Sequence, residues 1–101
     1  MDRVTLGKTG ITVCRNGFGA LPIQRIGKED AAYLVRKAYE NGVNFFDTAR
    51  IYTDSEEKLG YATSSFRDKI YIATKTAAKN GEDLKKDLET SLSLLKTDYI
   101  D

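Results

Sequence analysis

The sequence predicts an α/β fold made of successive strand–helix units, each about 30 residues long. Short apolar runs alternate with amphipathic helical patterns. The apolar runs begin near residues 17, 43, 70 and 99, a nearly regular spacing without any accompanying sequence repeat. Such alternation predicts parallel strands joined by right-handed crossovers. Units of this size build both doubly wound sheets and (β/α)₈ barrels.

The amino-terminal residues 1–15 are expected to form a β-hairpin. Apolar side chains alternate in Arg3–Leu6 and in Ile11–Cys14, and the glycine-rich turn Gly7–Gly10 separates the two runs. The small residues of 16–20 predict a short strand whose end leaves the backbone open to close approach. Pro22 then interrupts the chain in a connecting loop.

Three helices are predicted, over residues 28–41, from 55 to about 65, and from Asn80 to 95. Asp54 and Glu57 have the spacing of a capping box at the second helix, with Ser55 as a competing cap. The side chains expected to pack against the sheet are Ala31, Leu34, Val35, Ala38 and Tyr39, then Leu59, Ala62 and Phe66, then Leu84, Leu88, Leu92 and Leu95.

Charged residues stand at the ends of two predicted buried strands. Asp47 ends the strand 43–47, and Lys75 directly follows the strand 70–74. Neighbouring parallel strands end at the same edge of a sheet, so the carboxylate and the ammonium should lie within salt-bridge distance. A buried charge is costly unless it is paired or used.

Three further residues are expected at this edge. Gly19 and Ala20 end the first strand there, and Tyr52 can fold back over the edge because it follows Asp47 by five residues. This set of acid, phenol and ammonium is either a reactive site or a structural ion pair beside an ordinary surface aromatic residue. Position alone does not separate the two interpretations, because structural ion pairs also gather at strand ends.

Composition excludes several classes of function. The chain has 16 basic and 15 acidic residues, and this balance argues against nucleic acid or an anionic membrane as a partner held by charge. The absence of histidine excludes a Ser/His/Asp triad, a Cys/His pair and a histidine metal site within this chain. The single cysteine, Cys14, cannot form an internal disulfide and fits a reducing, cytoplasmic compartment. We find no membrane span and no secretory signal in the sequence.

Several motifs, in order and with matching spacing, closely resemble the amino-terminal part of aldo-keto reductases. They cover essentially the whole chain. The most specific is Asp47-Thr48-Ala49 followed by Tyr52, then Ser55-Glu56 and Leu59-Gly60, whereas Thr74-Lys75 alone would be weak. The other matching segments are Arg3–Gly10, Gly17–Gly19, Ile72–Lys75 and Asp98–Asp101.

This resemblance implies the amino-terminal part of a (β/α)₈ TIM barrel over residues 1–101. The hairpin 1–15 would close the barrel floor, and residues 16–101 would supply three βα units and the start of a fourth strand at Tyr99–Asp101. It also implies an NADPH-dependent oxidoreductase that reduces aldehydes or ketones. The substrate would be a small carbonyl compound, and its identity and the oligomeric state stay open.

The family's catalytic Asp, Tyr and Lys correspond to Asp47, Tyr52 and Lys75. The fourth catalytic position, a histidine, is expected within about ten residues beyond Asp101. The cofactor-binding positions implied by the resemblance are Gly19, Ala20, Leu21 and Asp47. No metal site is expected.

Two departures from the family pattern bear on the site. Thr53 stands where relatives often have glycine, and Gly19-Ala20-Leu21 replaces the Gly-Thr-Trp of some relatives. Backbone contacts to the cofactor survive the second change, but a hydroxyl contact does not. Pro22–Arg25 looks like bacterial and archaeal members, some of which carry an iron–sulfur extension at the far carboxyl end.

The implied mechanism transfers a hydride to the carbonyl carbon while Tyr52 protonates the carbonyl oxygen. A free tyrosine titrates near pH 10, and lowering this by about three units needs roughly 4 kcal/mol. The Lys75 ammonium is expected to supply much of that by favouring the phenolate, and Asp47 to hold the ammonium in place.

A barrel of this kind needs about 250 residues. The chain is therefore expected to be a partial product of a longer protein, and alone to lack reductase activity. It could instead be a fragment that assembles with copies or a complement, or a small independent domain. An alternative function is a non-catalytic barrel that senses nicotinamide nucleotide or binds a partner subunit, and a weaker one is a structural fragment without ligand.

Overall fold

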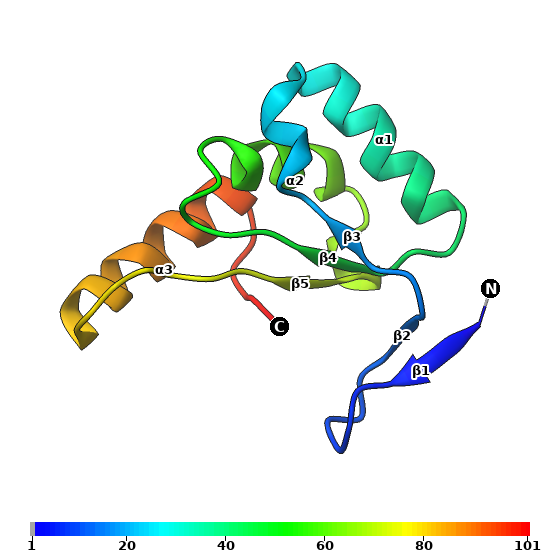
Figure 1. Ribbon diagram of the computed structural model, residues 1–101, viewed down its shortest axis with the longest axis horizontal. Coiled ribbons are helices and arrows are strands. Elements are labelled where there is room, and N and C mark those ends of the chain that lie inside the picture. The colour runs from blue at the N-terminus through cyan, green and yellow to red at the C-terminus, as the bar shows by residue number, and fades with distance from the viewer. Residues whose placement is uncertain (1) are drawn as a thin grey trace.

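The computed structural model describes residues 2–101, which form a hairpin, a three-stranded parallel sheet and three α-helices (Figure 1). The parallel strands alternate with the helices along the chain, as the sequence predicts. The elements are β1 Arg3–Thr5, β2 Thr12–Cys14, β3 Phe18–Gly19, the 3₁₀ helix η1 Pro22–Arg25, α1 Lys28–Glu40, β4 Phe45–Asp47, α2 Ser55–Thr63, the 3₁₀ helix η2 Arg67–Lys69, β5 Tyr71–Ala73 and α3 Gly81–Leu95.

Strands β1 and β2 form the antiparallel hairpin predicted for residues 1–15, apart from Met1, which lies outside the described residues. Asn44 attaches this hairpin to the chain just before β4. Its Oδ1 accepts from the Cys14 N–H at 2.8 Å, and its Nδ2 donates to the Thr12 carbonyl at 3.3 Å. The hairpin is therefore held beside the end where the parallel strands begin (Figure 1). Closure of a barrel floor by the hairpin stays a prediction.

The parallel sheet has the order β3-β4-β5, with Gly19 beside Asp47 and Asp47 beside Ala73. Its strands are shorter than predicted, although the backbone hydrogen bonds run on past their ends. The Ala20 N–H donates to the Asp47 carbonyl, and the Thr48 N–H donates to the Ala73 carbonyl, both at 2.8 Å. This continued pairing fixes the carboxyl ends of the three strands relative to one another.

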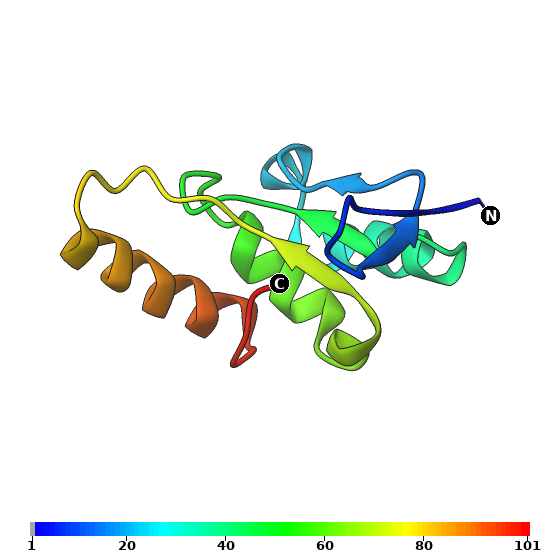
Figure 2. The same ribbon diagram turned by 90° about the horizontal axis from the view of Figure 1, so that it is seen from below.

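The helices lie to one side of the sheet (Figure 2). Phe46 and Ile72, the middle residues of β4 and β5, are fully buried and join the core beneath the helices, whereas their strand neighbours on the other face remain partly exposed. The larger of two buried apolar clusters consists of Ala32, Val35, Phe46, Leu59, Ala62, Phe66, Ile70, Ile72 and Leu95.

Part of the predicted helix packing is wrong. Leu34, Leu84 and Leu88 are close to half-exposed rather than packed against the sheet. The first turns of α3 project beyond the end of the sheet, so its leucine face meets the core only near Leu95 (Figure 2). Helical periodicity shows which residues share a face, but it does not show how far along the helix that face is covered.

Helices α2 and α3 pack closely together at Gly60. A Cβ atom at this position would lie 2.5 Å from the Leu94 carbonyl oxygen and 2.7 Å from the Leu95 Cα. These are backbone atoms and cannot turn aside as a side chain would. The glycine therefore lets the α2 backbone touch α3 directly.

The capping box predicted for α2 does not form. Asp54 is the N-cap residue but makes no side-chain cap hydrogen bond, because its carboxylate pairs with Lys58 at 2.9 Å instead. The competing cap, Ser55, is also engaged elsewhere: its Oγ donates to the Ala20 carbonyl at 2.8 Å. At α3 the predicted start is confirmed, since the Asn80 side chain accepts from the Asp83 N–H.

The segment Tyr99–Asp101, predicted as the start of a fourth strand, has no strand pairing of its own. It nevertheless lies along β5. The Asp101 N–H donates to the Ile72 carbonyl at 3.2 Å, and its carboxylate accepts from the Ile72 N–H at 3.0 Å. One backbone bond is too few for a ladder, but it places Asp101 where a next parallel strand would pair.

None of the helices found over residues 2–101 combines the length and apolar character that a bilayer crossing requires.

Candidate active site

Asp47 ends β4 at the carboxyl edge of the sheet, between Gly19 of β3 and Ala73 of β5. Its backbone is fixed from one side, where the Asp47 carbonyl accepts from the Ala20 N–H. Its side chain is 43% exposed. The sheet therefore fixes the backbone of Asp47, while its carboxylate remains accessible to solvent at the rim of the sheet.

Lys75 reaches this carboxylate from the neighbouring strand. The ladder between the two segments continues past β5, because the Arg50 N–H donates to the Lys75 carbonyl at 2.9 Å. The ammonium Nζ donates to Asp47 Oδ2 at 2.8 Å and to the Thr48 carbonyl at 2.7 Å. The structure thus brings together the acid and the amine that the sequence places at adjacent strand ends.

The charge state of Lys75 follows from these contacts. Desolvation is the largest influence and lowers its pKa, but the hydrogen bond and charge of Asp47, together with Tyr52, outweigh it and raise the pKa above the usual range. The lysine side chain is 50% exposed, so solvent screens the pair. Lys75 is a firmly protonated cation at neutral pH.

Tyr52 lies in the turn between β4 and α2. Its N–H donates to the Ala49 carbonyl at 3.1 Å, and its carbonyl accepts from the Ser55 N–H at 2.8 Å. The Lys75 Nζ lies 5.1 Å from the centre of the Tyr52 ring, within the range of a cation–π contact. The structure therefore assembles Asp47, Tyr52 and Lys75 at one rim of the sheet.

Thr53, one of the departures from the family pattern, has a φ of 40°. This left-handed conformation favours glycine and is strained for a β-branched residue. The Thr53 hydroxyl donates to Gln24 Oε1 at 2.8 Å, which ties the tyrosine turn to η1. This hydrogen bond restrains the turn at the position where relatives often have glycine.

The predicted cofactor positions differ in accessibility. Gly19 is exposed, with open space above its backbone, and the Leu21 side chain is also exposed. Ala20 is fully buried, with its N–H bonded to the Asp47 carbonyl and its carbonyl accepting from Ser55. At this strand end only Gly19 and Leu21 are open to a ligand, and the cofactor role of all three stays a prediction.

Sequence reasoning missed the polar groups beneath the rim. The hydroxyls of Thr48 and Ser55 are hydrogen-bonded at 2.8 Å and fully buried. Glu56 is also buried, paired with Arg50 and accepting from Thr74. The only sequence feature that pointed to these groups was the Ser55-Glu56 pair within the family motif. The periodicity of the sequence does not reveal the buried contacts of these two residues.

Lys58 was missed for the same reason. It is buried, and its Nζ donates to the carbonyls of Ile23 and Gln24 at 3.0 and 3.3 Å while pairing with Asp54. The hydrogen bond from Lys58 lowers the pKa of the Asp54 carboxyl below its usual range, and the positive charge of Lys58 adds to this effect. Lys58 thereby anchors the loop after β3 to the start of α2.

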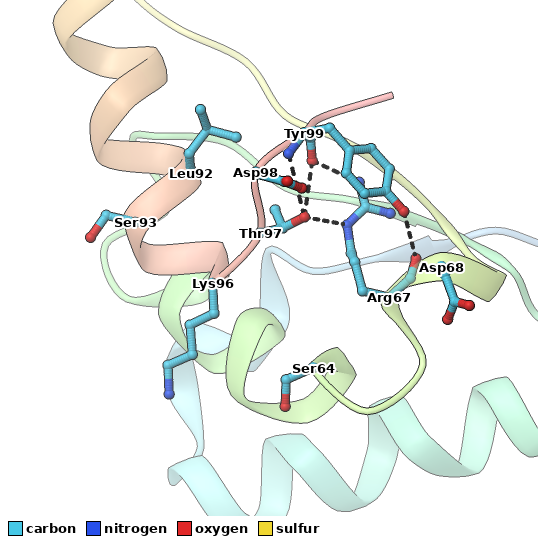
Figure 3. Close-up of a pocket in the computed structure, with 9 residues that line it drawn as sticks. All are labelled: Ser64, Arg67, Asp68, Leu92, Ser93, Lys96, Thr97, Asp98 and Tyr99. Carbon is cyan, nitrogen blue, oxygen red and sulfur yellow. Dashed lines mark hydrogen bonds between the residues drawn. The ribbon is translucent and has the colours of Figure 1, made fainter.

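An open groove elsewhere, between the ends of α2 and α3, holds no comparable constellation (Figure 3). Its buried cation, Arg67, is used structurally. The guanidinium donates to the Tyr99 carbonyl at 2.8 Å and to Asp101 Oδ2 at 2.9 Å, and it lies over the Tyr99 ring. The groove thus belongs to the fastening of the last residues of the chain.

Comparison with known proteins agrees with this geometry. The model of the aldo/keto reductase family matches residues 15–101. L-galactose dehydrogenase of Arabidopsis thaliana is 37% identical over 95% of this chain and 35% of its own length. The 6-dehydroglucose reductase of Novosphingobium aromaticivorans is 34% identical over 95% of this chain and 38% of its own length.

Solved structures extend the likeness to the fold. The holo form of an aldo-keto reductase from Bacillus halodurans superposes with a TM-score of 0.89 and 28% identity, over all of this chain and 38% of its own. The fold is therefore the amino-terminal part of a (β/α)₈ barrel. The chain spans little more than a third of the length of the curated relatives it matches.

Proposed function

The chain belongs to the aldo/keto reductase family of oxidoreductases, and from this we propose that the protein reduces aldehyde or ketone carbonyls to alcohols with NADPH. One observation in the structure supports the proposal most. A single ammonium, that of Lys75, is bound to the Asp47 carboxylate and lies over the Tyr52 ring, at the carboxyl ends of parallel strands. This is the end at which barrel enzymes carry their active sites.

In the proposed reaction Tyr52 is the general acid. The bound nicotinamide supplies the hydride that the carbonyl carbon accepts. Tyr52 gives its phenolic proton to the carbonyl oxygen, which completes the alcohol and leaves a phenolate. The Lys75 ammonium next to the ring stabilises that negative charge as it develops, and Asp47 keeps the ammonium in place. A proton from solvent then restores the phenol.

The residues present fit the nicotinamide end of such a cofactor. The half-exposed Asp47 carboxylate can accept from a ribose hydroxyl or a carboxamide N–H. The open backbone at Gly19 allows a flat ring to approach closely, and the exposed Leu21 offers an apolar side. We propose that Gly19, Leu21 and Asp47 hold this end, with Ala20 positioning the strand behind them.

The remaining parts of the site are proposed on the family resemblance. A histidine that orients the carbonyl, the phosphate-binding loops and the specificity loops lie outside these 101 residues, which contain no histidine. We propose accordingly that the 101-residue chain alone has no reductase activity. The cytoplasmic location expected from the single cysteine is also kept as a proposal.

The proposal is tested with the protein expressed from its complete reading frame (the full protein). NADPH binding is followed by fluorescence, and NADPH oxidation is followed with a panel of small aldehydes and ketones. We expect both binding and oxidation. Binding without oxidation of any carbonyl substrate would favour a nucleotide-sensing barrel, and absence of binding would contradict both functions. The 101-residue chain, assayed in parallel, should give no turnover.

A further inference from the structure

The carboxylate of Glu56 lies beneath the candidate catalytic residues in the first turn of α2 and is 1% exposed. Both of its oxygens have partners. Oε1 accepts from Arg50 Nη1, and Oε2 accepts from the Thr74 hydroxyl at 2.8 Å. The proposed reaction uses none of these three side chains.

The two partners of Glu56 belong to the two segments that carry the proton-transfer groups. Arg50 lies two residues before Tyr52 in the turn after β4, and Thr74 directly precedes Lys75 after β5. The segments are also joined by the Arg50 N–H, which donates to the Lys75 carbonyl. Glu56 therefore connects the tyrosine turn to the lysine segment through two side-chain contacts on one carboxylate.

The proposed catalytic side chains, Lys75 and Tyr52, cannot by themselves fix the distance between the ammonium and the phenol ring. Lys75 has a long, flexible side chain that is half-exposed, and ion pairs between exposed groups contribute little. The turn beyond Tyr52 contains the strained Thr53. A buried and fully paired hydrogen-bond network, by contrast, holds one geometry.

Burying a charged carboxylate costs free energy, and apolar side chains of similar volume often stabilise a core at least as well. Stability alone is therefore a weak reason for a glutamate at this place. The need for a fixed distance between Lys75 and Tyr52 is a stronger reason for the glutamate, because a displacement of 1 Å at a reacting group can cost about a hundredfold in rate.

We propose that Glu56 is a positioning residue for proton delivery, which sets the place of Tyr52 relative to Lys75 through Arg50 and Thr74. This inference rests on the proposed function, in which Tyr52 is the general acid.

The first test compares Glu56→Gln with Glu57→Gln in the full protein. Glu57 is the exposed neighbour in the same turn and receives the same chemical change. Glutamine at position 56 keeps the shape but removes the charge and turns an amide toward one of the two partners. We expect kcat to fall about tenfold, with KM for the carbonyl and NADPH affinity within about twofold, because only transition-state geometry is disturbed. Glu57→Gln should match the unmodified protein.

A second pair of variants tests the same contact without altering a charge. Thr74→Val removes the hydroxyl that donates to Glu56 and keeps the volume, whereas Thr74→Ser keeps the hydroxyl. We expect the valine variant to lose turnover as Glu56→Gln does, and the serine variant to retain it. This pair decides the question even if Glu56→Gln fails to fold.

The solvent deuterium isotope effect on kcat separates positioning from a merely structural role. Slower proton delivery from Tyr52 makes that step more rate-limiting, so the isotope effect should rise in Glu56→Gln and Thr74→Val. A structural defect lowers the active fraction and leaves the isotope effect unchanged, and this result would overturn the inference.

Tyr52→Phe is assayed alongside to keep the two proposals apart. If it loses turnover while Glu56→Gln and Thr74→Val equal their controls, the positioning role is wrong and the reductase mechanism stands. If Tyr52→Phe keeps full turnover, the proposed acid is wrong, and the positioning role is overturned with it.

Discussion

The Lys75 ammonium lies 2.8 Å from a carboxylate oxygen of Asp47, although 28 residues separate them in the sequence. The two residues meet because parallel strands β4 and β5 end side by side, and the hydrogen-bonded ladder continues to the lysine backbone. The Tyr52 ring completes the group. The arrangement has consequences for pH dependence, stability and catalysis.

The raised pKa of Lys75 predicts a loss of stability at alkaline pH. Desolvation opposes the shift, but Asp47 and Tyr52 outweigh it, so the folded-state pKa lies above the unfolded one. The ion pair's stabilisation is then complete below the usual lysine pKa and is lost as pH rises through the folded-state value. Urea unfolding of the full protein and of Lys75→Met should differ by less than about 1 kcal/mol at neutral pH, because the pair is half-exposed. The difference should shrink at high pH, and growth of the difference there would contradict this prediction.

The left-handed Thr53 predicts an unusual order of stability among its variants. Thr53→Gly and Thr53→Ala both lose the hydrogen bond to Gln24, so the difference between them reports the backbone strain. The glycine variant should be more stable by about 0.5–1 kcal/mol, since a φ of 40° is unfavourable for any residue with a Cβ. Thermal unfolding measures this order, and an alanine variant as stable as glycine would show that the site is not strained.

The contact between α2 and α3 predicts a costly substitution at Gly60. Gly60→Ala forces a methyl group against the α3 backbone, and overpacking of this kind costs about 1–3 kcal/mol. Gly81→Ala is the matched control, because a Cβ there meets no atom within 4 Å and alanine favours a helix start. Urea unfolding should show a lower midpoint for Gly60→Ala only. Equal midpoints would mean that the helices can move apart freely.

Arg67 is predicted to hold the last residues of the chain against β5. The residue is 8% exposed, and its guanidinium donates to the Thr97 hydroxyl and the Tyr99 carbonyl (Figure 3). It also donates to the Ile70 carbonyl and to the Asp101 carboxylate. Arg67→Met leaves the Asp101 carboxylate without its cationic partner, which should cost about 3 kcal/mol and speed amide exchange at Ile72, whose N–H donates to that carboxylate. Tyr99→Phe removes only one long hydrogen bond and should leave exchange unchanged. Unaltered protection of Ile72 in Arg67→Met would contradict this role.

The sequence could predict that Asp47 and Lys75 meet at one rim of the sheet, because their meeting depends only on where two parallel strands end. Asp47 and Lys75 each follow an apolar run, and parallel pairing then requires them to be neighbours. The alternation of strands and helices and the start of α3 at Asn80 were predictable for the same local reasons.

The sequence could not predict features that depend on long-range competition for partners. Asp54 has the spacing of a cap, but buried Lys58 offers it a stronger partner. Leu84 and Leu88 share a helix face with Leu95, yet only Leu95 of these three packs in the core. The pairing of Glu56 with Thr74 joins elements far apart in the sequence, and no local pattern encodes it.

The central claim, that Tyr52 is the general acid of a carbonyl reductase, is tested most directly by turnover of Tyr52→Phe in the full protein. Tyr33→Phe serves as the control, since Tyr33 is 63% exposed on α1. We predict that kcat of Tyr52→Phe falls by about 10²–10⁴-fold with NADPH affinity nearly unchanged, while Tyr33→Phe keeps full activity. Turnover of Tyr52→Phe equal to that of the unmodified protein would contradict the claim.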